Sequence, residues 1–185
     1  GAIETDVRMT VDGALVLFHD ATMDRVTNGH GPVDDHTLAE LRALTVGEGV
    51  EPGPQHQILT LDELLDEYAA RTHLVLEIKD PRVTEPMLDH LRDRNLTGTV
   101  TITSFLWYPL LAVRERAPNV AVGFLTPTFD DDIVARAHRR GFQQICPHIS
   151  QLTARRVQRA KARGLRVRAF GIEHRFQIER LFETG

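Results

Sequence analysis

The sequence lacks several features that mark particular classes of protein. It has one cysteine, Cys146, so no internal disulfide can form, which favours a reducing compartment. Basic residues do not exceed acidic ones, and a formal net charge of −4 does not match the basic footprint of a nucleic-acid-binding protein. No apolar run approaches the roughly 18 residues that a membrane span needs. We therefore expect no nucleic-acid partner and no integral membrane segment.

What is present is the composition of an ordinary globular protein. Of the 185 residues, 42% are hydrophobic and 26% are charged, which excludes disordered and fibrous classes. The length suits one domain, and we interpret residues 1–185 as a single domain. The sequence begins without a methionine inside a strand-like run and stops at Gly185 directly after a helical pattern, so we expect both ends to be cut. A cytoplasmic location is favoured, and a secreted or periplasmic one is left open.

Short apolar runs alternate with helical patterns from residue 74 onward. The runs are Leu74–Lys79, Thr99–Ser104, Val120–Leu125, Gln144–Cys146 and Leu165–Phe170. Their starts lie roughly 20 to 25 residues apart, which is the length of one βα unit. Repeated βα units predict a parallel sheet that is either closed into a barrel or open and doubly wound.

Charged residues on two predicted strands favour the barrel. Glu4 and Asp6 are two residues apart, so their side chains leave the same face of one strand, and the same holds for Glu77 and Lys79. In an open sheet that face is covered by helices, where charges are costly. In a barrel such residues can lie at the rim of the interior, where catalytic groups collect. We predict an α/β fold of the TIM-type (β/α)8 barrel, incomplete at both ends.

The stretch from residue 20 to residue 57 interrupts this rhythm. It contains glycine- and proline-rich segments and one short capped helix at Thr37–Leu44. We interpret residues 20–57 as a small surface insertion that follows the strand ending in His19-Asp20. Directly afterwards, Thr60-Leu61-Asp62-Glu63 forms a capping box, which predicts the start of a helix at Thr60.

Glu4, Asp6 and Glu77 form the first candidate site. Three carboxylates that meet at one point repel one another, and each tends to hold its proton. A divalent cation resolves that conflict, and hard oxygen ligands suit Mg²⁺ or Ca²⁺. The alternative is that the three residues are unrelated surface charges.

His19 is the second candidate. Asp12-Gly13 marks a tight reversal, and a two-residue hairpin loop there would pair Asp6 with His19. If the two segments were neighbouring parallel strands, their carboxyl ends would also be adjacent. Either geometry brings the imidazole close to the carboxylates and favours a general acid or base. The alternative is a hydrogen-bonded core histidine.

Lys79 is unusual because only two of the 22 basic residues are lysines. The other, Lys161, lies in an arginine-rich helix and is interpreted as surface. An ammonium group two residues from Glu77 could neutralise a phosphate oxygen. It could equally balance the charge of the three carboxylates, and the two roles are compatible.

Several ordered motifs match one known family. They are Ile3-Glu4-Thr5-Asp6-Val7, Thr10-Val11-Asp12-Gly13, His19-Asp20, Arg25-Val26-Thr27-Asn28-Gly29, Thr37-Leu38-Ala39-Glu40-Leu41, Leu59-Thr60-Leu61-Asp62-Glu63, Glu77-Ile78-Lys79 and Thr103-Ser104-Phe105. Over nearly the whole chain, they closely resemble the signature of the glycerophosphodiester phosphodiesterases. The ordered set Glu-x-Asp, His-Asp and Glu-Ile-Lys is the most specific part.

The resemblance implies a metal-dependent enzyme that hydrolyses small glycerophosphodiesters to glycerol 3-phosphate and an alcohol. One Mg²⁺ or Ca²⁺ is expected at the three carboxylates. His19 is expected to be catalytic and Lys79 to act in catalysis by contacting the phosphate. We expect His19 to protonate the departing alkoxide while a second histidine acts as base, and the reverse order stays open. Phe170-Gly171-Ile172-Glu173 stand where the family often has Trp-Thr-Val-Asn, and Phe170 could offer the glycerol carbons an apolar wall.

Two family segments are not found in this sequence. They are a His-Arg-Gly strand ahead of residue 1, which supplies the second histidine and a phosphate-binding arginine, and an Asp-Gly-Ile-Ile-Thr-Asp segment after Gly185. We therefore expect the 185-residue chain alone to be poorly active. The alternatives are a related phospholipase-type phosphodiesterase and a non-catalytic phosphate-binding barrel. A lipid substrate predicts an apolar rim on the insertion, which its polar sequence does not favour.

Overall fold

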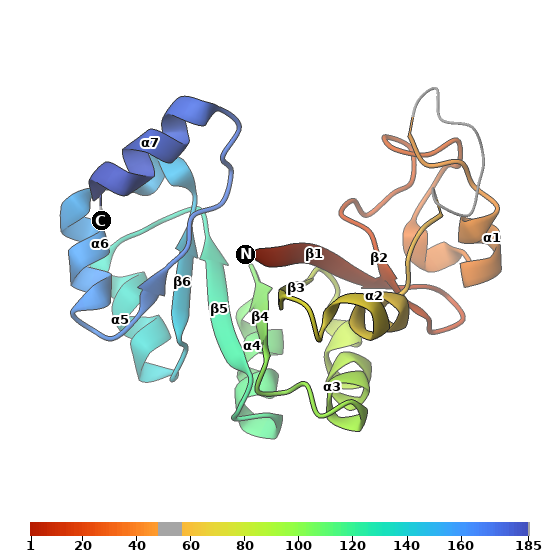
Figure 1. Ribbon diagram of the computed structural model, residues 1–185, viewed down its shortest axis with the longest axis horizontal. Coiled ribbons are helices and arrows are strands. Elements are labelled where there is room, and N and C mark those ends of the chain that lie inside the picture. The colour runs from red at the N-terminus through yellow and green to blue at the C-terminus, as the bar shows by residue number, and fades with distance from the viewer. Residues whose placement is uncertain (48–56, 185) are drawn as a thin grey trace. The chain divides into compact units, whose positions relative to one another are not determined.

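The computed structural model describes residues 1–47 and 57–184 (Figure 1). Residues 48–56 of the predicted insertion and Gly185 lie outside the described residues. The chain divides into two compact units, Gly1–Val100 and Thr101–Gly185. The single domain over 1–185 stays a prediction. Among the described residues, none of the helices is both long enough and apolar enough to cross a bilayer.

The first unit contains β1 at its centre, antiparallel to β2 and parallel to β3. Its strands are β1 (Ala2–Met9), β2 (Leu15–Leu17) and β3 (His73–Ile78). Its helices are α1 (Leu38–Arg42), α2 (Leu61–Tyr68) and α3 (Thr84–Asp93), with short 3-10 turns η1 (Val33–Asp35) and η3 (Pro81–Val83).

The second unit alternates strands and helices. Its strands are β4 (Val100–Ser104, which starts at the last residue of the first unit), β5 (Ala121–Thr126), β6 (Gln144–Pro147) and β7 (Arg166–Val167). Its helices are α4 (Trp107–Arg116), α5 (Asp131–Arg139), α6 (Ala154–Lys161) and α7 (Arg175–Thr184), with a 3-10 turn η4 (Ile149–Gln151). Neighbouring strands from β4 to β7 are parallel, and Figure 1 shows α5 alongside β6. The predicted βα rhythm is confirmed.

Helix ends follow the signals in the sequence. Asp130 caps α5 by accepting a hydrogen bond from the backbone N–H of Ile133 at 2.9 Å. Gly141 follows this helix with a φ of +70°, a conformation that glycine adopts without steric cost. Thr153 caps α6 in the same manner as Asp130. These local signals determine where these helices begin and end.

The loop that joins β1 and β2 is longer than the sequence predicts. Val7 lies opposite Leu17 in an antiparallel ladder, so Asp6 is level with Phe18, whose N–H donates to the Asp6 carbonyl at 3.0 Å. The expected pairing of Asp6 with His19 is wrong by one residue. The alternative of neighbouring parallel strands is also wrong.

Side-chain hydrogen bonds explain the longer loop. The hydroxyl of Thr10 donates to the Asp12 carboxylate at 2.5 Å and accepts from the N–H of Ala14 at 2.9 Å. Gly13 takes a φ of +86° within the turn. The same Asp12 carboxylate also accepts from the N–H of Leu38 at the start of α1 at 3.1 Å. The loop therefore spans five residues because its polar groups hold both the turn and the first helix.

The last predicted strand is shorter than expected. The run Leu165–Phe170 contributes only Arg166–Val167 to the parallel ladder. Phe170 is joined to His148 by an isolated bridge, and Gly171 then turns the backbone with a φ of +74°. Apolar periodicity alone could not show where the ladder hydrogen bonds stop.

Helix α2 offers a direct test of the capping rule. The Thr60 side chain accepts from the N–H of Glu63, and the Glu63 carboxylate accepts from the N–H of Thr60 at 2.8 Å. Thr60→Ala should lower the free energy of unfolding by about 1 kcal/mol, as measured by urea denaturation. Thr60→Ser keeps the hydroxyl and should stay close to wild type. Equal stability of both variants would contradict the role of the cap.

Candidate active site

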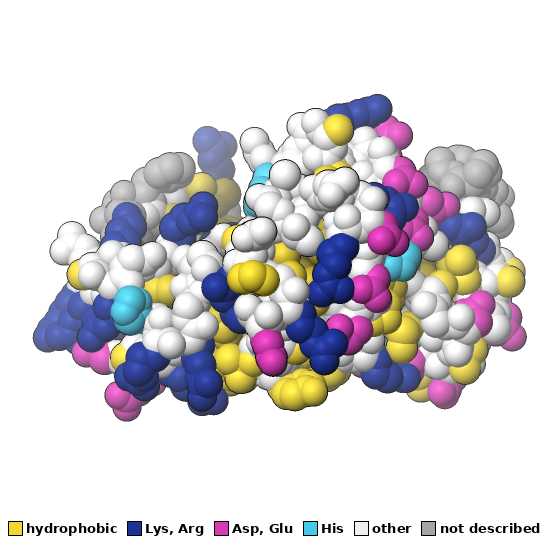
Figure 2. Space-filling model, turned by 90° about the horizontal axis from the view of Figure 1, so that it is seen from below, with side chains coloured by type: hydrophobic (Ala, Val, Ile, Leu, Met, Phe, Trp, Pro, Cys, Tyr) yellow, Lys and Arg dark blue, Asp and Glu magenta, His cyan; other side chains and the backbone are white. Residues whose placement is uncertain are grey.

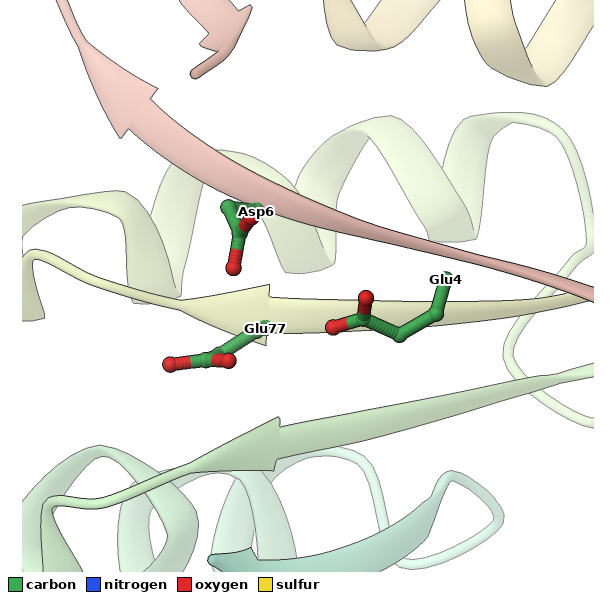
Figure 3. Close-up of side chains that lie close together, drawn as sticks. All are labelled: Glu4, Asp6 and Glu77. Carbon is green, nitrogen blue, oxygen red and sulfur yellow. The ribbon is translucent and has the colours of Figure 1, made fainter. Parts of the chain in front are cut away.

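The three predicted metal ligands meet in the first unit. Asp6 on β1 is the direct neighbour of Glu77 on β3 in the parallel ladder, and Glu4 lies two residues earlier on the same face. One carboxylate oxygen from each residue lies within 4.8 Å of the other two. Figure 3 shows the Glu4 and Asp6 side chains leaving β1 on the side where Glu77 leaves β3. The predicted convergence is confirmed.

Glu77 is the most buried of the three residues, with 5% of its surface exposed. Burial raises the pKa of its carboxyl above the ordinary value, and the charges of Asp6 and Glu4 add to the rise, whereas Lys79 opposes it. An ionised Glu77 is therefore costly unless additional positive charge is nearby. A buried carboxyl with a raised pKa is typical of functional sites, and a bound cation would remove this cost.

Lys79 lies against this cluster. Its ammonium nitrogen is 2.7 Å from Glu77 Oε1 and 3.1 Å from Asp6 Oδ1, and its side chain is 16% exposed. Burial lowers the pKa of Lys79, but the hydrogen bonds and charges of Glu77 and Asp6 outweigh this effect and raise it. Lys79 is thus a protonated charge-balancing partner. Its contact with phosphate stays a prediction.

The chemistry of the donors fits a divalent cation. Glu77 Oε1 is fully buried, and its ion pair with the Lys79 ammonium at 2.7 Å uses only one of its two lone pairs. This oxygen can therefore accept a further ligand. Three carboxylates and one ammonium group carry a formal charge of −2, and hard oxygen donors suit Mg²⁺ or Ca²⁺.

His19 follows β2 in a bend of the chain. Its backbone is held close to β1, because the preceding Phe18 bonds to Asp6 and the guanidinium of Arg8 donates to the His19 carbonyl at 3.0 and 3.3 Å. The imidazole side chain is 65% exposed. It is therefore a surface histidine one residue from the level of Asp6, and not the core histidine of the alternative interpretation.

The imidazole of His19 contacts Asp20, which in turn contacts Arg25, and the sequence pattern assigns neither residue a role. Nδ1 lies 2.6 Å from Asp20 Oδ1. Arg25 donates to both oxygens of that carboxylate, from Nε at 2.6 Å and from Nη2 at 3.0 Å. The adjacency of His19 and Asp20 in the sequence could have indicated their contact. The contact of Arg25 with Asp20 could not be predicted, because it depends on the fold of the loop between them.

A cavity of about 460 Å³ opens beside these three residues. Its lining consists of Thr5, Leu17, Phe18, His19, Asp20, Arg25, Val26, Val46, Gln57, Ile58 and Leu59. His19, Asp20 and Arg25 supply charged and polar groups, and most of the other lining side chains are apolar. The imidazole therefore borders a space that small molecules can enter.

Phe170 lies in the second unit, where it contacts two aromatic rings. Its ring centroid is 5.1 Å from that of Phe105 and 5.2 Å from that of His148, both in edge-to-face geometry. Phe105 is 40% exposed, so this small aromatic group reaches the surface. The substrate-binding role of Phe170 stays a prediction.

Comparisons with known proteins agree with these features. The model of the glycerophosphoryl diester phosphodiesterase family matches residues 1–185. A glycerophosphodiester phosphodiesterase of Caldanaerobacter subterraneus subsp. tengcongensis is 30% identical over 99% of this chain and 78% of that protein. The crystal structure of a glycerophosphoryl diester phosphodiesterase from Silicibacter pomeroyi matches all of this chain and 77% of that chain, with a TM-score of 0.87 and 24% identity. The structure of a phosphodiesterase of Oleispira antarctica, in complex with the product sn-glycerol-3-phosphate, is also similar. The match covers 98% of this chain and 77% of that chain, with a TM-score of 0.84 and 26% identity.

These comparisons place the chain among enzymes with an α/β fold that hydrolyse phosphodiesters. The chain belongs to the glycerophosphoryl diester phosphodiesterase family. The predicted fold class, an α/β barrel of the TIM type, is confirmed by this membership and by the likeness to solved structures.

Proposed function

We propose that the protein hydrolyses glycerophosphodiesters to glycerol 3-phosphate and an alcohol, with the aid of one divalent cation at Glu4, Asp6 and Glu77. The observation that carries this proposal is the convergence of the three carboxylates beside a protonated lysine in a member of this family. The sn-glycerol-3-phosphate bound to the Oleispira antarctica relative supports the choice of product.

A divalent cation held at the carboxylates would stabilise the negative charge that develops on the non-bridging phosphate oxygens. Lys79 supplies a second positive charge at the same place. Its ammonium group has three N–H donors, so it can retain Asp6 or Glu77 and still donate to a phosphate oxygen. The substrate would thus be bound through its phosphate, which every glycerophosphodiester shares.

His19 supplies the proton in the proposed reaction. An oxygen nucleophile attacks phosphorus, the bond from phosphorus to the alcohol oxygen breaks, and the departing alkoxide takes a proton from the imidazole. The exposure of His19 gives a leaving alcohol access to the ring. The complementary base that removes the proton from the nucleophile is not assigned to a residue of this chain.

The distribution of charge favours a cation over bare carboxylates. The first unit contains 19 acidic and 8 basic residues, whereas the second contains 7 acidic and 14 basic residues. Figure 2 shows Lys and Arg side chains gathered over the surface of the second unit. The acidic cluster thus lies in the acidic unit, where an anionic phosphodiester would be repelled unless further positive charge is bound.

A chelator assay tests this proposal. The intact protein should release glycerol 3-phosphate from glycerophosphocholine or glycerophosphoglycerol, lose this activity in excess chelator, and recover it when Mg²⁺ or Ca²⁺ is restored. Adding the two ions in separate reactions would identify the cation that supports turnover. Full activity in the presence of the chelator would contradict the role of the cation.

The panel of substrates separates the proposal from its alternatives. Faster release of product from a lysophospholipid than from any glycerophosphodiester would favour the phospholipase-type enzyme. Binding of inorganic phosphate without turnover of any diester would favour the non-catalytic barrel. Preference for one head group among glycerophosphodiesters would define the physiological alcohol.

A further inference from the structure

We infer that Asp20 and Arg25 are positioning residues that hold the His19 imidazole in one tautomer, with Nδ1 protonated and Nε2 available for proton transfer. This inference rests on the proposed catalytic role of His19. It goes beyond that role because it names the groups that orient the ring and specifies the nitrogen that acts.

His19 and Asp20 are joined by a short hydrogen bond. Nδ1 of the imidazole lies 2.6 Å from Asp20 Oδ1, which is the length of a strong charge-assisted hydrogen bond. An ionised carboxylate only accepts hydrogen bonds, so the proton of this contact must belong to Nδ1. The other nitrogen, Nε2, points away from the carboxylate; it carries the proton that the general acid gives up when the ring is doubly protonated, and it is a free acceptor when the ring is neutral.

Arg25 keeps the Asp20 carboxylate ionised and in place. Its guanidinium donates from Nε to one carboxylate oxygen and from Nη2 to the other, so the carboxylate cannot rotate without breaking a bond. The Arg25 hydrogen bond, followed by that of His19, holds the pKa of the Asp20 carboxyl well below its usual range. At any pH near neutrality, Asp20 therefore stays an acceptor for the imidazole.

The exposed His19 ring needs neighbouring groups to fix its orientation. The His19 side chain is 65% exposed, so packing alone does not fix the orientation of its ring. The guanidinium of Arg8 fixes the backbone at the His19 carbonyl, and the chain through Asp20 to Arg25 fixes the ring. Proton transfer is sensitive to small errors in position, so an exposed general acid benefits from both restraints.

A second trio with the same chemistry lies elsewhere in the first unit. His90 Nδ1 lies 2.6 Å from Asp62 Oδ1, and Arg94 Nη2 lies 2.8 Å from the same oxygen, between helices α2 and α3. What distinguishes the His19 trio is its connection to β1 beside Asp6 and its position on the cavity wall. The His90 trio is therefore a matched control.

The kinetic test uses Asp20→Asn alone and in combination with His19→Ala. Asp20→Asn should lower kcat by about 10- to 100-fold, with a smaller change in KM. If Asp20 acts through the imidazole, the same substitution should have no further effect on the His19→Ala enzyme. An equal loss in both backgrounds would overturn the inference. The control Asp62→Asn should retain wild-type kcat.

Arg25 is tested by two substitutions. Arg25→Gln removes the charge and the paired N–H groups, and it should lower kcat by about 10-fold. Arg25→Lys keeps the charge but cannot donate two parallel hydrogen bonds, so it should recover only part of that loss. Complete recovery by lysine would show that the paired donation is not needed and would overturn the role assigned to Arg25.

A spectroscopic readout keeps this inference separate from the proposed function. Nitrogen-15 NMR of the imidazole at alkaline pH should show a proton on Nδ1 of His19 in the wild type, and a mixture of tautomers in Asp20→Asn. The His19→Ala spectrum assigns the signal. Lack of turnover by the wild type would refute the proposed function, yet these spectra would still decide the tautomer. A proton on Nε2 in the wild type would overturn the inference.

Discussion

Replacing Glu77 by glutamine is expected to lower kcat/KM for a glycerophosphodiester by about 10²- to 10³-fold. Glutamine has nearly the same shape, but it removes one of the three negative charges that would hold the cation. The variant should also lose the rise in melting temperature that Mg²⁺ or Ca²⁺ gives the wild type by binding only the folded state. Activity assays and thermal melts with and without the cation measure both effects.

The same substitution should not weaken the fold in the absence of a cation. The pKa of Glu77 is raised in the folded state, chiefly by burial. Ionised Glu77 therefore disfavours folding above its unfolded pKa, and this cost disappears when the side chain is neutral. Glu67→Gln, at a surface residue that pairs with Arg71, is the matched control and should behave as the wild type. Unchanged activity and cation response of Glu77→Gln would contradict the assignment.

Replacing His19 by alanine is expected to reduce kcat by about 10²- to 10⁴-fold, the usual contribution of a general acid or base. Because the side chain is 65% exposed, the fold should survive the change. The variant should retain cation binding, since the three carboxylates are untouched. Turnover numbers together with the cation-dependent shift in melting temperature separate the two functions.

The substrate offers a further check on His19. A diester with an acidic leaving alcohol such as p-nitrophenol needs little protonation, so His19→Ala should lose much less activity with that substrate than with glycerophosphocholine. His90→Ala, which removes a histidine with the same carboxylate contact, should leave both activities near wild type. Near-normal turnover of glycerophosphocholine by His19→Ala would rule out the proposed role.

Much of this site could be predicted because it depends on periodicity. Residues two apart on a strand share a face, and this rule placed Glu4 beside Asp6 and Glu77 beside Lys79. The parallel ladder then makes Asp6 the neighbour of Glu77. The regular βα spacing predicted which runs become strands, and caps such as Thr60 marked where helices begin.

The parts that could not be predicted depend on side chains that bond across loops. The Thr10 hydroxyl and the Asp12 carboxylate hold a longer β1–β2 loop, and the pairing of the two strands is shifted by one residue. A turn rule based on Asp-Gly alone does not predict this shift. The contact of Arg25 with Asp20 likewise requires the path of the intervening chain. Composition and spacing identify candidates for such bonds, but only the fold selects among them.

The most direct measurement is an anomalous diffraction map from crystals of the intact protein soaked in Mn²⁺, a heavier substitute for Mg²⁺ with similar oxygen ligands. We expect one strong peak within bonding distance of oxygens from Glu4, Asp6 and Glu77. Absence of a peak at that position, or a peak that contacts none of these carboxylates, would contradict the proposed cation site.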